Sequence, residues 1–175
     1  MKKMTGIVLF ALSGLALIAA AAAGINSNWS EHLSGDFEVP VRDTQGQGQA
    51  IFHLSSDGTS LEYKLIASNI ENVFMAHIHR GAPTENGPIV VWLAPSTAPV
   101  AGPPGGGRTD GVLAKGTITA ANLVGPLAGQ PLSALVELMN SGRAYANVHT
   151  SDGDATPNEG PGDFPGGEIR GNLTG

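Results

Sequence analysis

The strongest constraint on the fold is a pair of alternating segments separated by a tight turn. Every second residue is apolar in segments 50–54 and 61–65, and residues 55–59 between them contain an Asp-Gly pair. A period of two places apolar side chains on one face of a strand, and Asp-Gly is typical of a hairpin turn. The sequence therefore predicts an antiparallel hairpin with one buried face.

Further strands are expected along most of the chain, with Trp92 covering one edge of the core. They are residues 32–39, 70–78, 88–93, 112–119, 144–150 and 167–171, and the first strand of the hairpin extends back to residue 45. Residues 94–111 and 152–167 are rich in Gly and Pro and are expected to form surface loops. The pattern predicts an all-β fold.

One segment of the chain has a helical period instead. Its apolar positions are Leu132, Leu135, Val136 and Met139. This spacing of three and four predicts a short helix near residues 131–141, with Pro131 in the first turn and Gly142 at the C-terminal cap. We expect this helix to pack across one end of the β-structure.

The composition indicates one globular β-rich domain with long turns. Of 175 residues, 41% are hydrophobic, 25 are Gly and 12 are Pro. The absence of Cys excludes both a disulfide framework and a thiol-linked lipid anchor.

The first 23 residues have a different character from the rest. Lys2 and Lys3 precede an apolar run over residues 7–18 and then a tract of alanines. A basic start, a short apolar stretch and small residues are typical of a secretory signal peptide. We expect residues 1–23 to be a signal peptide, or alternatively an uncleaved N-terminal anchor, and residues 24–175 to be the folded domain. The protein is then secreted, or lies at the cell surface or in the periplasm.

The acidic balance of the domain limits its partners. Without Lys2 and Lys3, the 9 basic side chains become 7 against 15 acidic ones, so the net charge is −8. Such a charge disfavours nucleic acid and anionic membranes as partners, and a membrane contact is expected only through an uncleaved N-terminal segment.

The candidate metal ligands are three histidines. His77 and His79 share one face of a strand, opposite the face of Phe74 and Ile78 that is expected in the core. His149 lies on the polar face of another strand. Three imidazole nitrogens meet the ligand requirement of copper or zinc. These histidines therefore predict a transition-metal site if they converge in space.

The alternative for these histidines is a hydrogen-bonded structural network. Its other members are Asn147, Glu168 and Arg170, which would pin the last strand to the centre of the sheet. Glu168 and Arg170 are also expected as a surface ion pair or cross-strand contact.

Two weaker site hypotheses concern the loops and the termini. Asp152, Asp154 and Asp163 have part of the spacing of a calcium-binding loop, but Pro157 replaces the required glycine and no helices are expected to flank the loop. Asn28 and Asn172 begin Asn-x-Ser/Thr sequons, which become glycosylation sites only in a host with the machinery.

Several motifs in order resemble one known family. They are HLSGDFEVP (32–40), GQGQAIFHL (46–54), AHIHRG (76–81), NGPIVVWL (86–93), AYANVHT (144–150) and GEIRG (167–171). On these motifs the chain resembles the CHRD domain, a module of chordin and of secreted microbial proteins. The resemblance implies an immunoglobulin-like antiparallel β-sandwich or barrel, in a family whose biochemical activity is largely undefined.

No catalytic arrangement is recognisable, so the chain is expected not to be an enzyme. It has no Cys, no G-x-S-x-G and no H-E-x-x-H. We expect an extracellular binding or surface-structural module that contacts a protein, a glycan or its own copies. The alternative is a transition-metal-binding protein. A superoxide dismutase is a remote alternative, because His77-x-His79 resembles the strand of the copper-zinc enzymes but the other ligands have no counterparts.

Overall fold

The computed structural model describes residues 27–95, 106–153 and 160–175. The expected signal peptide, residues 1–23, lies outside these ranges, as do Asp154 and most of the loop expected over residues 94–111. Among the described residues, no helix is long and apolar enough to cross a bilayer.

The described residues form one antiparallel sheet of eight strands. The strands are β1 (Asn28–Ser34), β2 (Gln47–Leu54), β3 (Leu61–Glu71), β4 (Val73–Arg80), β5 (Ile89–Ala94), β6 (Arg108–Ile118), β7 (Ala144–Thr150) and β8 (Ile169–Leu173). Their order across the sheet is β5-β4-β7-β8-β1-β2-β3-β6, and all neighbouring strands in it pair antiparallel. This confirms the expected all-β sandwich or barrel with one short helix.

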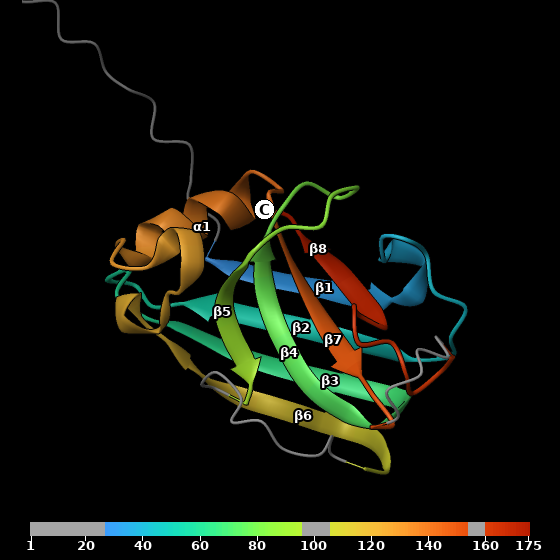
Figure 1. Cartoon of the computed structure of the whole chain (residues 1–175). Coiled ribbons are helices and arrows are strands. Elements are labelled where there is room, and N and C mark those ends of the chain that lie inside the picture. Colours follow the sequence, from blue (N-terminus) through green and yellow to red (C-terminus); the bar gives the residue numbers. More distant parts are fainter. Residues whose placement is uncertain (1–26, 96–105, 154–159) are drawn as a thin grey trace, which may run out of the picture.

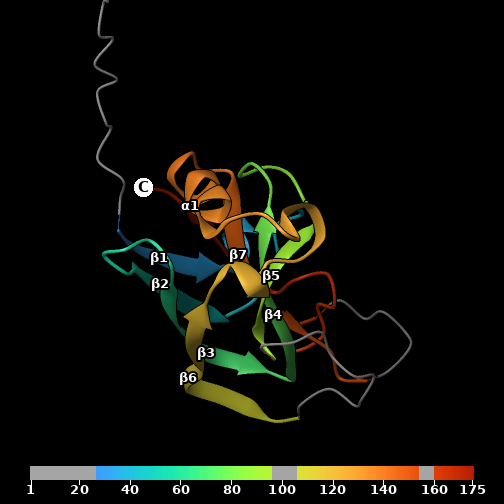
Figure 2. The same cartoon turned by 90° about the vertical axis from the view of Figure 1, so that its left-hand side faces the viewer.

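The sheet curves into two layers that enclose the core. In Figure 1, β4, β5 and β7 cross in front of β1, β2, β3 and β6, and Figure 2 shows the same layers from the side. β5 and β6, the two edge strands of the sheet, approach each other, so the barrel is nearly closed. Fully buried side chains from both layers fill the space between them, including Trp29, Phe52 and Leu65 from one layer and Ile78 and Val148 from the other.

The predicted hairpin is confirmed as β2 and β3. Phe52 lies opposite Tyr63 in the register, so the two apolar faces coincide. The turn is held by Asp57, whose Oδ1 accepts hydrogen bonds from the Ser55 hydroxyl (2.7 Å) and the Thr59 amide (3.0 Å). Gly58 adopts a φ of +70°, the region that glycine enters without strain.

The predicted helix is confirmed as α1 (Leu132–Asn140). All four of its expected apolar residues are buried, and Figures 1 and 2 place the helix across one end of the barrel. It ends in a Schellman motif, in which the Gly142 amide donates to the Met139 carbonyl (3.2 Å) and the Arg143 amide to the Leu138 carbonyl (2.8 Å). Gly142 has a φ of +65°, as this motif requires.

The first strand begins and ends earlier than residues 32–39. β1 stops at Ser34, whose hydroxyl accepts a hydrogen bond from the Asp36 amide (3.2 Å) and starts a 3-10 turn over residues 35–37. A Cβ at Gly35 would lie 2.4 Å from the Arg42 carbonyl oxygen, so the chain folds back tightly there. The alternation of residues 32–39 did not reveal this turn.

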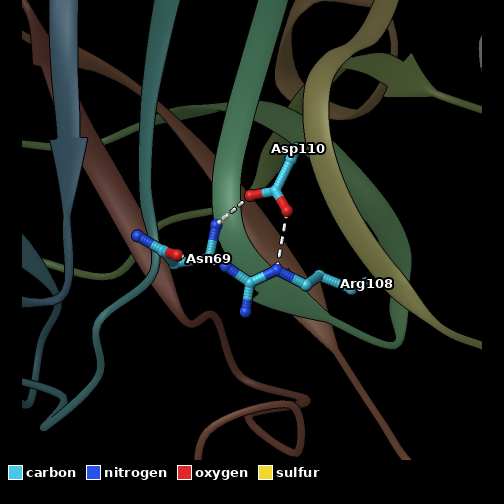
Figure 3. Close-up of polar contacts among 3 residues, drawn as sticks. All are labelled: Asn69, Arg108 and Asp110. Carbon is cyan, nitrogen blue, oxygen red and sulfur yellow. Dashed lines mark hydrogen bonds and ion pairs between the residues drawn. The ribbon is translucent and has the colours of Figure 1, made fainter.

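The loop expected over residues 94–111 is also corrected at its end, because β6 begins at Arg108. The register between β3 and β6 shifts between Ala67 and Ile70, and Asn69 takes a φ of +54° there. Figure 3 shows how polar contacts hold this irregularity. Asp110 accepts hydrogen bonds from the Asn69 amide (2.8 Å) and from Arg108 Nε (2.6 Å), while Arg108 also donates to the Asn69 side chain. A composition rich in Gly and Pro carries no sign of such pairing.

Candidate metal centre

Neighbouring strands bring the three predicted histidines together. His77 and His79 lie on β4 and His149 lies on β7, which pairs with β4 in antiparallel register. One ring nitrogen from each residue lies within 4.8 Å of the others. Convergence of residues 72 positions apart was the geometric condition for the metal hypothesis, and the structure meets it.

The histidines face away from the hydrophobic core, but they are not exposed. His77, His79 and His149 are only 1%, 8% and 6% exposed. They lie on the outer face of the layer formed by β4, β5 and β7, where side chains and loops cover them. The site is thus a small polar interior separate from the apolar core.

Aromatic rings form much of the wall around the histidines. Trp92 meets His77 edge-on at 4.3 Å between ring centroids, and Tyr145 stacks on His79 at 4.8 Å with the planes 2° apart. Trp92 is half-buried beside the cluster, whereas the sequence suggested that it covers an edge of the core.

Phe74 also differs from its expected place. Strict alternation put it in the core with Ile78, but its ring lies 6.3 Å from the ring of His149. The register between β4 and β7 shifts between Val73 and Met75. Such a β-bulge moves one residue out of the alternation, which explains why Phe74 is found on the histidine side.

Backbone carbonyls fix the protonation of two of the rings. Nδ1 of His79 lies 2.8 Å from the Gly87 carbonyl oxygen, and Nδ1 of His149 lies 2.9 Å from the Pro165 carbonyl oxygen. A carbonyl only accepts, so each neutral ring must carry its proton on Nδ1. Nε2 of both rings therefore keeps its lone pair, as in histidines that bind metals.

The third ring, that of His77, also has a nitrogen with a buried lone pair. His77 Nδ1 lies 3.0 Å from His149 Nε2, which is a lone-pair acceptor, so His77 donates from Nδ1. Its own Nε2 then has the lone pair. Nε2 of His77 and Nε2 of His79 are buried without a hydrogen bond of normal geometry. Such groups are rare in folded proteins and call for a partner.

Burial keeps all three rings neutral. Desolvation lowers the pKa of His149 to about 4 and lowers the pKa of His77 further, to about 2, with repulsion from neighbouring rings adding to the effect. The pKa of His79 is also lowered by burial and by Arg170, against the raising effect of the Gly87 carbonyl and the Asn147 amide. Neutral imidazole is the form that binds metals.

Asn147 and Arg170 adjoin the cluster, as the network hypothesis expected. The Asn147 side-chain amide contacts His149 Nε2 at 3.0 Å. The same side chain hydrogen-bonds to the Glu38 carboxyl, so Asn147 connects the histidine cluster with Glu38. Arg170 is fully buried, with its guanidinium 3.4 Å above the centroid of Tyr145, and it donates to the Ala82 carbonyl at 2.8 Å.

Glu168 lies elsewhere and does not pair with Arg170. Its carboxylate accepts hydrogen bonds from the Thr44 hydroxyl (2.5 Å), the Thr150 hydroxyl (2.6 Å) and the Gly162 amide (2.9 Å). Glu168 and Arg170 are both fully buried, so the expected surface ion pair is wrong. Glu168 instead ties three loop and strand segments together.

The calcium-loop and glycosylation hypotheses remain predictions. Asp152 is exposed whereas Asp163 is 3% exposed, and Asp154 lies outside the described residues. Asn28 is exposed at the start of β1. Asn172 is half-buried, and its side-chain oxygen accepts a hydrogen bond from Arg170 Nε at 3.2 Å.

Three contributors to the site were missed by sequence reasoning. Gly87 and Pro165 act through their backbone carbonyls, which have no signature in a sequence. Glu38 is 4% exposed, and burial raises the pKa of its carboxyl to about 7 in spite of the nearby Arg170. It lay in a segment interpreted as a simple strand.

The fold and the site together define the class of this protein: an antiparallel β-barrel with a buried histidine cluster on the outer face of one layer. A family model of the CHRD domain matches residues 29–157, which include all three histidines. The chain therefore belongs to the CHRD domain family, and the resemblance seen in its motifs is confirmed. Comparisons with curated proteins and with solved structures gave no match.

Proposed function

We propose that this chain is an exported, non-enzymatic CHRD domain that binds a transition metal ion, copper or zinc, through His77, His79 and His149. One observation carries the proposal. Backbone carbonyls hold the Nδ1 protons of His79 and His149, and this leaves the metal-binding nitrogens of a buried three-histidine cluster free of protons. Export rests on the pattern of residues 1–23.

The spacing of the cluster is close to that of a bound metal. At metal–nitrogen distances of about 2.0–2.1 Å, tetrahedral ligands are separated by about 3.4 Å. One ring nitrogen of each histidine lies within 4.8 Å of the others. Small side-chain rotations suffice to bring the nitrogens to coordinating positions.

Metal binding also resolves the cost of the buried lone pairs. Nε2 of His77 and Nε2 of His79 make no hydrogen bond of normal geometry, and an unmet buried acceptor costs about 1–3 kcal/mol. A purely structural network would be expected to satisfy these atoms. A ligand that binds only the folded state would stabilise the domain by mass action.

The test is metal stoichiometry on the purified mature domain, residues 24–175. We expect about one equivalent of zinc by elemental analysis after equilibration and gel filtration, with a raised melting temperature. His77→Gln and His149→Gln should each lose the bound metal. His53→Gln, at an exposed histidine on β2, is the matched control and should retain it.

The alternative is identified by the same samples. Wild-type protein that binds no metal, while His77→Gln and His149→Gln unfold at lower temperature, would contradict the proposal and support a structural network. Metal that remains bound in both variants would also contradict it, since the ion would then lie elsewhere.

A second function, contact with another extracellular protein, is favoured by one surface feature. Phe37 is 43% exposed and Val41 is 64% exposed, beside a hollow of about 420 Å³ that Pro40 and Pro83 help to line. Exposed apolar groups that cluster on a monomer often mark a protein contact. A double variant, Phe37→Ser with Val41→Ser, should abolish capture of a cell-envelope protein or self-association in sedimentation. Capture or association at wild-type strength in that variant would contradict this role for the patch.

A further inference from the structure

The electrostatic environment of the histidine cluster limits the charge of the ion that fits. All three candidate ligands are neutral imidazoles, because they are buried and backbone carbonyls hold the Nδ1 protons of His79 and His149. The hydrogen-bond partners of the three rings are the Gly87 and Pro165 carbonyls, Asn147 and one another, none of which is charged. Glu38 is a buried acid of the same region, and its carboxyl lies near the positive charges of Arg170 and Arg42.

The positive charge of Arg170 adds to this bias. Its guanidinium lies 3.4 Å from the centroid of Tyr145, and the same ring stacks on His79. The positive charge of Arg170 therefore lies close to the cluster. A divalent ion would bring two further positive charges into this site, and none of the three histidines carries a negative charge that would neutralise them.

The walls of the cluster add a second bias, because they are apolar and aromatic. Trp92 lies against His77, and Phe74 lies near His149. Rings of this kind cannot hydrate or neutralise a doubly charged ion. The cost of moving an ion out of water rises steeply with its charge, so a singly charged ion pays far less to enter such a site.

A soft ligand is also at hand. Met75 lies opposite His149 in the pairing of β4 with β7, on the same face of β4 as His77. Its side chain is half-buried. Thioether sulfur selects Cu(I) among the biological metals, and Met75 is two residues from His77 on the strand.

From this neutral ligand set, its cationic neighbour and the placement of Met75, we infer that the cluster is a Cu(I) site, with the Met75 thioether as an additional ligand. The inference rests on the proposed function, since it specifies which metal the three histidines hold. The site should bind Zn(II) less tightly than Cu(I), because Zn(II) gains little from the thioether sulfur.

The test compares the Cu(I) and Zn(II) affinities of the wild type and three variants by competition with chromophoric chelators, with Cu(I) kept reduced in the absence of oxygen. Met75→Leu should weaken Cu(I) binding about tenfold or more and change Zn(II) binding less than threefold. Asn147→Asp places a carboxylate beside His149 Nε2 and should tighten Zn(II) binding about tenfold, with a smaller effect on Cu(I). Met139→Leu, which removes a sulfur from α1, is the control and should change neither affinity.

The outcomes distinguish a failure of the proposed metal binding from a failure of the Cu(I) inference alone. Wild-type protein that binds neither metal would contradict the proposed function itself. Protein that binds Zn(II) through the histidines but prefers it over Cu(I), or a Met75→Leu variant with wild-type Cu(I) affinity, would overturn only the Cu(I) inference. Melting curves of the metal-free variants establish that each is folded before its affinity is interpreted.

Discussion

At the scale of single residues, Arg170 links the histidine cluster to the loop that covers it. Its guanidinium donates to the carbonyls of Ala82 (2.8 Å) and Glu85 (3.2 Å) and to the side chain of Asn172 (3.2 Å). The same loop continues to Gly87, whose carbonyl orients His79. A buried cation that satisfies several carbonyls is costly to replace, because the acceptors then lose their partner.

Arg170→Lys should therefore destabilise the domain by about 2–4 kcal/mol, since lysine lacks the planar fork and its stacking on Tyr145. Urea unfolding measures the loss. Arg108→Lys is the control: its ion pair with Asp110 is 51% exposed on both sides, so the change should be about 1 kcal/mol or less. Equal losses in the two variants would contradict the role given to Arg170.

Protonation of the histidines makes the metal-free domain sensitive to acid. Burial lowers the pKa of His77, His79 and His149 below the ordinary 6.5, so the unfolded chain binds protons that the folded chain does not. The free energy of unfolding should fall as the pH drops below about 6.5, by about 1.4 kcal/mol per pH unit for each histidine. The contribution of His149 ends near pH 4.

Glu38 opposes this trend over a defined window. Its pKa is raised by burial from 4.5 to about 7, so the folded state alone binds its proton between these values and gains stability as the pH falls. The destabilisation from three histidines is larger than the stabilisation from one carboxyl. The free energy of unfolding therefore falls as the pH drops from 6.5 to 4.5. Glu38→Gln should steepen that loss. Urea unfolding with a chelator at several pH values measures both profiles, and a flat wild-type profile would contradict the burial of neutral histidines.

At the scale of elements, the alternation and the helical period of the sequence predicted which face of each element lies in the core. They did not predict which loops cover the opposite, polar face. The alternation of β4 and β7 correctly placed His77, His79 and His149 on a face away from Ile78 and Val148, and the helical period predicted the buried face of α1. The bulge that displaces Phe74 could not be predicted, because one extra residue leaves no mark in the pattern. Nor does a period show whether a loop later buries the polar face.

The helix offers a direct test of the packing at the end of the barrel. Leu135 is fully buried on α1, so Leu135→Ala should lower the free energy of unfolding by about 2–5 kcal/mol. Glu137→Ala, on the exposed side of the same helix, should change it by less than about 0.5 kcal/mol. Chemical denaturation measures both, and a small effect at Leu135 would mean that the helix is not part of the cooperative core.

At the scale of the whole molecule, the last strand joins the two layers. β8 lies between β7 and β1 in the sheet, although it comes last in the chain. It pairs with β7 from Ile169 to Leu173 and also contacts β1. The order of strands across a sheet follows from long-range packing, and the alternation within each strand did not reveal it.

Removal of residues 169–175 should therefore prevent folding, because β7 and β1 would lose the strand between them. Near-ultraviolet circular dichroism and one-dimensional proton spectra would report the loss of fixed packing. Removal of residues 174–175 is the control, since both are exposed beyond the end of β8, and that protein should fold. A folded product of the longer deletion would contradict the closure of the sheet through β8.

The central claim, that three histidines of this CHRD domain hold one metal ion, is tested most directly by X-ray absorption at the zinc edge of the zinc-loaded protein. We predict a first shell with three imidazole nitrogens at about 2.0–2.1 Å and the outer scattering of their rings. In His79→Gln the imidazole count should fall to two. A shell made of oxygen without imidazole scattering, or one unchanged in His79→Gln, would contradict the account.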